Sequence, residues 1–203
     1  MNNKELFDKG EYETLVARLS DLKDVESLTL LGYSYQKLGK WESAMDVWTQ
    51  LIVLNPYHAD FYNERGVCKF QLRFKHAIQD FDKAIELVPT NPYFYGCRAY
   101  IKDKTGDTEG AIEDYNKAHI LDPEDATTLN NLGLAEQKLG YTQRARERFK
   151  NSDDLLGIKT IDSRAEPPST PEKNSIWKEF KKMISSKKGF FDFLEDAGLK
   201  RKK

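Results

Sequence analysis

Small and aromatic residues recur along this chain at a step of 33 or 34 residues. Alanine stands at Ala44, Ala77, Ala111 and Ala145, and four positions after each comes an aromatic residue: Trp48, Phe81, Tyr115 and Phe149. A second small residue recurs at Gly32, Gly66, Ala99 and Gly133. A chain built from one repeated unit lacks a single globular core, so we expect its function on an extended surface rather than in one pocket.

Each repeat is predicted to be a pair of helices. In the first full repeat, Leu28, Leu31 and Tyr35 are spaced to share one helical face. Gly39 then interrupts the helix, and the second helix ends before Pro56, because proline lacks the amide hydrogen and restricts the residue before it. Two antiparallel helices approach closely only where a small residue faces the partner, so the recurring glycines and alanines are predicted to have a packing role.

The pattern resembles the tetratricopeptide repeat, whose signature is Trp-x2-Leu-Gly-x2-Tyr, then Ala-x3-Phe, then Pro, in about 34 residues. The second repeat departs from it, since Leu72-Arg73-Phe74 makes the turn between its helices one residue short, and the fourth repeat has no closing proline. The resemblance implies an all-α fold, a right-handed superhelix of paired helices whose concave groove is lined by the first helix of each repeat, with a C-terminal helical tail added here.

The predicted domain organisation follows the repeat. We expect an N-terminal capping half-repeat at 1–24, because end units meet water on one side. Four repeats follow over 25–157, at 25–58, 59–91, 92–125 and 126–157. After Gly157 the periodicity stops, and the prolines of 158–174 indicate a linker. Residues 175–203 form a basic amphipathic tail.

The resemblance places a peptide-binding groove on the first helices. By spacing alone, the residues facing it are Leu30, Tyr33, Asn63, Val67, Phe70, Tyr93, Tyr100, Asn130, Asn131 and Leu134. Asparagine amides can hydrogen-bond a peptide backbone, and tyrosines can stack or donate. Some members of the family clamp the C-terminal carboxylate of heat-shock chaperones with lysine and arginine, and the matching positions here supply no such cations. The alternative interpretation is that several of these side chains belong to the core between repeats.

The tail carries large apolar residues among lysines. Residues 170–203 hold 10 Lys and Arg against 5 Asp and Glu, whereas residues 1–169 hold 22 against 28. Such a segment is too apolar for a solvated tail and is expected to dock. The docking residues are predicted to be Ile176, Trp177, Phe180, Ile184, Phe190 and Phe191. The chain's own acidic body, a partner protein and an anionic membrane surface remain alternatives, while the acidic body argues against nucleic acid.

Nothing in the sequence indicates catalysis. It has no glycine-rich phosphate loop and no nucleophile with an evident histidine partner. The histidines His58, His76 and His119 stand at unrelated places in the repeat, so we expect neither a metal nor a cofactor. Without a signal peptide or an apolar run of about 18 residues, the chain is expected to be cytoplasmic with reduced cysteines. We therefore expect a non-catalytic scaffold or adaptor that binds a protein or peptide partner; the alternative is a peripheral membrane adaptor anchored by the tail.

Overall fold

The computed structural model describes residues 1–158, and all regular structure within them is helical. These residues fall into two compact units, 1–47 and 48–158, which are described separately. The predicted linker and the tail, with its docking residues from Ile176 to Phe191, lie outside the described residues.

The first unit contains the residues predicted to form a capping half-repeat, 1–24. It comprises α1 (Asn3–Asp8), α2 (Tyr12–Leu19) and α3 (Val25–Lys37), which contact one another. Asn2 caps α1 by accepting the Glu5 amide, and Asp24 caps α3 by accepting the Ser27 amide at 2.9 Å. Such caps satisfy amides that have no partner within the helix. The next helix, α4 (Trp41–Leu54), runs across the boundary between the two units.

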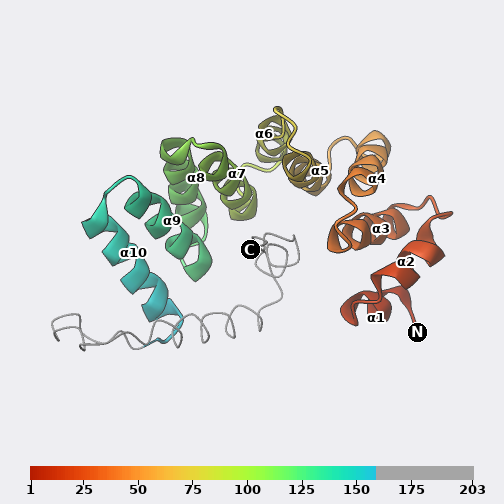
Figure 1. The fold of residues 1–203 in the computed structure, drawn as a ribbon, viewed down its shortest axis with the longest axis horizontal. Coiled ribbons are helices and arrows are strands. Elements are labelled where there is room, and N and C mark those ends of the chain that lie inside the picture. Colours follow the sequence, from red (N-terminus) through yellow and green to blue (C-terminus); the bar gives the residue numbers. More distant parts are fainter. Residues whose placement is uncertain (159–203) are drawn as a thin grey trace, which may run out of the picture. The chain divides into compact units, whose positions relative to one another are not determined.

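The second unit stacks three further helix pairs (Figure 1). Its helices are α5 (Ala59–Gln71), α6 (Ile78–Leu87), α7 (Pro92–Thr105), α8 (Thr108–Leu121), α9 (Ala126–Lys138) and α10 (Thr142–Leu155). Each helix contacts the next, and the first helices of successive repeats also contact each other, α5 with α7 and α7 with α9. This arrangement confirms the all-α repeat fold.

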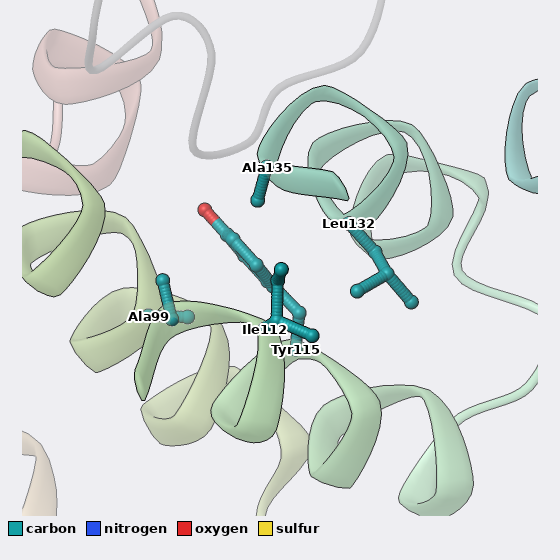
Figure 2. Close-up of a cluster of buried hydrophobic side chains, with 6 residues drawn as sticks. Ala99, Ile112, Tyr115, Leu132 and Ala135 are labelled. Carbon is teal, nitrogen blue, oxygen red and sulfur yellow. The ribbon is translucent and has the colours of Figure 1, made fainter. Parts of the chain in front are cut away.

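The recurring small residues make these close approaches possible. A methyl group placed at Gly66 would lie 2.8 Å from Cε2 of Phe81, and one at Gly133 would lie 2.6 Å from Cε1 of Phe149. In the third repeat the same role falls to Ala99, which is buried with Ala111 and Tyr115 (Figure 2). The packing role predicted for the small residues is therefore confirmed at these positions.

That core also joins one repeat to the next. In Figure 2, Tyr115 and Ile112 of α8 point toward α9, where Leu132 and Ala135 face them. All four are buried, and Leu132 has no solvent exposure. The apolar core therefore continues from α7 and α8 of one repeat into α9 of the next, as expected for a stacked repeat protein.

The turns between the paired helices depend on one left-handed residue. Glycine takes this conformation at Gly39 (φ 69°), Gly106 (φ 102°) and Gly140 (φ 83°). In the second repeat the equivalent residue is Arg73, with φ 60°. The turn that is one residue short is thus closed by an arginine in a conformation that favours glycine.

Candidate functional site

The predicted groove residues of the second unit lie on α5, α7 and α9. We call this set, with Gly96 added, the first-helix face: Asn63, Val67, Phe70, Tyr93, Gly96, Tyr100, Asn130, Asn131 and Leu134. Because α7 contacts both α5 and α9, the three helices bring these positions into one neighbourhood.

The nine positions differ in their access to solvent. Tyr93 is 45% exposed and Leu134 is 51% exposed, while Phe70, Tyr100 and both asparagines of α9 are half-buried. Asn63 and Val67 are 0% and 4% exposed, so they lie beneath the surface and not on it, contrary to their predicted position. Periodicity placed them on the correct helix but could not show that these positions of α5 are buried.

Tyr100 is held in place from two sides. Its ring meets Phe70 of α5 edge to face at a centroid distance of 6.5 Å, and Nζ of Lys104 lies 5.2 Å from its centroid. Burial, followed by the nearby Asp103 carboxylate, raises the pKa of its hydroxyl. Tyr100 therefore stays neutral at physiological pH, and its ring is held between Phe70 and Lys104.

An ion pair joins α7 to α9 near this face. Nζ of Lys138 lies 2.8 Å from Oδ1 of Asp103, which also accepts the Thr108 hydroxyl at 2.9 Å. Burial opposes ionisation of Asp103, but the hydrogen bonds from Lys138 and Thr108 outweigh it and lower its pKa. The cation and the carboxylate neutralise each other, so the first-helix face stays mainly neutral.

In the first unit, the predicted residues Leu30 and Tyr33 are both half-buried on α3. The Tyr33 ring meets Phe7 of α1 at a centroid distance of 6.4 Å. Helix α1 therefore covers part of Tyr33, which leaves less of this side chain available to a ligand than spacing alone suggests.

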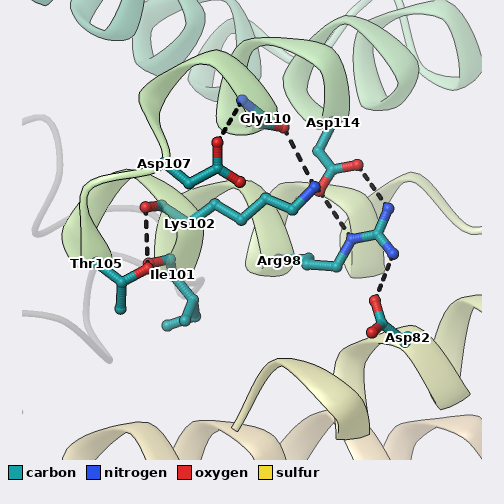
Figure 3. Close-up of polar contacts among 8 residues, drawn as sticks. All are labelled: Asp82, Arg98, Ile101, Lys102, Thr105, Asp107, Gly110 and Asp114. Atoms are coloured by element: carbon teal, nitrogen blue, oxygen red, sulfur yellow. Dashed lines mark hydrogen bonds and ion pairs between the residues drawn. The ribbon is translucent and has the colours of Figure 1, made fainter. Parts of the chain in front are cut away.

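A charged network fixes the third repeat behind this face (Figure 3). Arg98 of α7 makes two hydrogen bonds to Asp114 of α8, at 2.8 and 2.6 Å, and a third to Asp82 of α6, at 2.7 Å. Lys102 reaches the same Asp114 at 2.9 Å. One arginine thus connects three helices, and a planar guanidinium suits this task because it donates in fixed directions.

The same bridge recurs in the second repeat, and the fourth repeat has it with the charges reversed. In the second repeat Asp80 is paired with Arg65 at 2.8 Å and Lys69 at 2.9 Å. In the fourth repeat the position of Lys69 holds Glu136, which is fully buried, and the position of Asp80 holds Arg148. Arg144 and Arg148 approach the Glu136 carboxylate at 3.2 and 3.6 Å. The positions of Lys69 and Asp80 thus carry opposite charges in each of these repeats, and the pair joins the two helices whichever helix supplies the cation.

Sequence reasoning missed two features. One is Gly96, whose signal is a glycine inside a helix at a position where the repeat requires no small residue. The other is a shallow hollow of about 340 Å³ at the ends of α8 and α10, lined by His119, Pro123, Leu129, Asn151, Asp154 and Leu155. The hollow is formed by residues from three helices and the α8–α9 connection, so no local motif marks it.

Two further kinds of site are missing from the part of the chain that the structure describes. Within residues 1–158, no three His, Cys, Asp or Glu side chains gather as metal ligands. In the same residues, no helix is long and apolar enough to span a bilayer.

Known proteins match this chain through the repeat. Sequence models described as "TPR repeat" and "Tetratricopeptide repeat" match residues 26–56, 81–113 and 99–140. A "DnaJ homolog subfamily C member 7 homolog" of Dictyostelium discoideum is 28% identical over 161 residues, which is 77% of this chain and 29% of the relative. The human "Mitochondrial import receptor subunit TOM70" is 31% identical over 62% of this chain and 22% of its own length. The chain thus spans less than a third of these relatives.

Solved structures share the fold. "MamA 41-end from Desulfovibrio magneticus RS-1" superposes with a TM-score of 0.68 at 21% identity, over 78% of this chain and 93% of that one. A second structure, "Crystal structure of MamA", gives a TM-score of 0.64 at 24% identity over 77% and 96%. The repeat motif, the paired helices and the matching repeat models agree, and the chain is built from tetratricopeptide repeats.

Proposed function

We propose that this protein is a non-catalytic scaffold whose first-helix face binds a segment of a partner protein. The observation that carries the proposal is that Tyr93 and Leu134 are exposed and Tyr100 is half-buried on first helices that contact one another. Accessible apolar side chains mark interaction surfaces where they form one contiguous patch, and the contact of Tyr100 with Phe70 links two of the first helices in this way. The names of the relatives agree with such a role, since they include an import receptor subunit and the "Heat-shock protein cognate (HSC) co-chaperone sgt12".

The chemistry of the face indicates the kind of segment. Asn130 and Asn131 offer amides that can both donate to and accept from a peptide backbone, and the tyrosines and Leu134 offer apolar contacts. The lysine and arginine set that would clamp a terminal carboxylate is missing from the sequence positions where the family has it. The face therefore suits an extended or helical segment with apolar anchors.

The state of the cysteines supports a non-catalytic role. Cys68 and Cys97 are buried thiols that are not joined in a disulfide. Burial, followed by the nearby Glu64 carboxylate, raises the pKa of the Cys97 thiol, which keeps it protonated at neutral pH. An activated cysteine nucleophile needs the opposite shift.

Selection from a random dodecapeptide phage library on the immobilised full-length protein tests this proposal. We expect the selected peptides to bind the double variant Tyr100→Ala with Leu134→Ala at least tenfold more weakly, with unchanged helicity. The matched control is Val53→Ala with Ile120→Ala, two exposed apolar residues of the second helices α4 and α8. Equal affinity for the wild type and the groove double variant would refute the proposal.

The basic tail supports a second candidate, a peripheral membrane adaptor. Its lysines alternate with Trp177 and Phe180 in the sequence, which is typical of segments that lie in the headgroup region of an anionic bilayer. Flotation with phosphatidylserine vesicles, carried out on the protein with and without residues 170–203, distinguishes the membrane adaptor from the scaffold. Only the full chain should float if the tail is an anchor; equal behaviour of the two proteins excludes this function.

A further inference from the structure

Three glycines lie inside the first helices of the second unit, and one of them differs from the others. Gly66 and Gly133 are pressed against aromatic rings of the paired helix, so their lack of a side chain is required by packing. Around Gly96, in the middle of α7, a methyl group would meet nothing within 4 Å among the described residues. Glycine weakens a helix interior, and no packing contact of Gly96 compensates for that loss.

The open position at Gly96 lies between two tyrosines. Tyr93, Gly96 and Tyr100 follow a spacing of three and four residues, which places them on one face of α7. The two tyrosines are seven residues apart, a rise of about 10 Å along a helix axis. A glycine between them leaves room for a bulky side chain to reach the backbone of α7.

The neighbouring repeats fill the equivalent position. Asn63 stands there in α5 and Asn130 in α9, and the Asn63 side chain is fully buried. Only in α7, among these three first helices, is the position without a side chain. The gap is therefore local, and we call it the Gly96 slot, bounded by Tyr93, Gly96 and Tyr100.

We propose that the Gly96 slot receives an aromatic side chain from residues 175–197 of the same chain, so that the tail occupies the first-helix face and competes with partner segments. The inference deepens the proposed function and rests on it, because it assumes that the first-helix face is a binding surface. A ring inserted between Tyr93 and Tyr100 can make edge-to-face or stacked contacts with both tyrosines.

The composition, charge and length of the tail argue for it as the occupant. Residues 175–197 include Trp177, Phe180, Phe190, Phe191 and Phe193. Residues 170–203 have twice as many basic as acidic residues, and residues 1–169 have an acidic excess, so tail and body attract each other. A random-coil chain of about 17 residues, the length of the predicted linker, spans roughly 23 Å on average. Helix α10 contacts α9, and α9 contacts α7. Packed helix axes lie about 8–10 Å apart, so the distance from α10 to α7 is within the reach of the linker.

Hydrogen exchange of the full-length protein tests the inference. We expect the amides of residues 175–197 to be protected in the wild type, and Gly96→Leu, which fills the slot, to accelerate their exchange at least tenfold. Glu113→Leu is the control, because it adds the same side chain at an exposed position of the second helix α8. An unprotected tail in the wild type, an unchanged tail in Gly96→Leu, or equal acceleration in both variants would each overturn the inference.

Photo-crosslinking tests the docking of the tail without substituting Gly96, and so applies even if Gly96→Leu perturbs folding. Replacing the exposed Tyr93 by p-benzoylphenylalanine in the full chain should give an intramolecular crosslink to residues 175–197, with a yield independent of protein concentration. Crosslinks only to other regions, or only between two copies, contradict the inference. If phage-selected peptides still require Tyr100 and Leu134 while the tail fails both tests, the face binds partners and the tail is not its occupant.

Discussion

At the scale of single residues, the turn of the second repeat stores strain that the other turns avoid. Arg73 has the left-handed conformation that glycine takes at the equivalent Gly39, Gly106 and Gly140. This conformation costs a residue with a side chain roughly 1–2 kcal/mol. We expect Arg73→Gly to raise the free energy of unfolding by about 1 kcal/mol, part of the gain being offset by the greater freedom of glycine in the unfolded chain.

Equilibrium urea unfolding measures this change. Arg73 is exposed, so its replacement removes no buried contact. The control is Lys75→Gly, two residues later in the same turn, because Lys75 is also exposed but does not have a positive φ. This control should not stabilise the protein. A lower free energy of unfolding for Arg73→Gly than for the wild type would contradict the account of the turn.

Glycines in the first helices should respond to alanine in opposite ways. At Gly66 the new methyl group meets the fully buried Phe81 ring at 2.8 Å, and overpacking costs roughly 1–3 kcal/mol, which exceeds the gain of about 1 kcal/mol in helix propensity. At Gly96, in a chain without residues 170–203, the methyl group enters open space, so only the propensity gain remains. Thermal unfolding should show Gly66→Ala less stable than the wild type, and Gly96→Ala without residues 170–203 more stable than its tail-deleted parent. Two shifts of the same sign would contradict the assignment of one glycine to packing and the other to an open slot.

At the scale of helices, an ion pair joins the two members of each of the last three repeats, and the fourth repeat reverses its polarity. Breaking a buried pair leaves a charge without a partner and costs roughly 3–5 kcal/mol. Glu136→Lys places a cation against Arg148, so we expect a loss of that size. The double variant Glu136→Lys with Arg148→Asp reproduces the polarity of Lys102 and Asp114 and should recover most of the loss.

A double-mutant cycle in urea checks this prediction, with Arg148→Asp as the second single variant. The more exposed Arg144 can turn toward water, so it should not prevent recovery. Additive losses in the cycle would mean that the two positions do not interact, and that the distance of 3.6 Å between Arg148 and Glu136 reflects no stabilising pair.

The helices and their packing show which parts of this structure could be predicted from the sequence. The spacing of small and aromatic residues was sufficient to predict the helix pairs, because close helix packing needs a small residue opposite a large one. It could not predict that Asn63 and Val67 are covered, since burial there depends on how α7 lies on α5. Gly96 stands outside the recurring small positions, which is visible in the sequence, but the sequence could not show that the space beside it is open.

At the scale of the whole molecule, stacked repeats stabilise their neighbours. α10 covers α9 through the contact of Gly133 with Phe149 and supplies both arginines that face the buried Glu136. We expect truncation after residue 140 to unfold α9 together with the lost helix, while α7 and α8 keep slow amide exchange. Exchange measured by mass spectrometry distinguishes the helices; retained protection in α9, or loss of protection through α7, would contradict nearest-neighbour stacking.

The central claim is that the first helices, and not the second helices, bind a partner segment. The most direct test is the hydrogen-exchange footprint of a phage-selected peptide on the full-length protein. The account predicts slower exchange in α7 and α9 around Tyr100 and Leu134, with α6 and α8 unchanged. A footprint confined to α6 and α8, or to the hollow lined by His119 and Leu155, would contradict it.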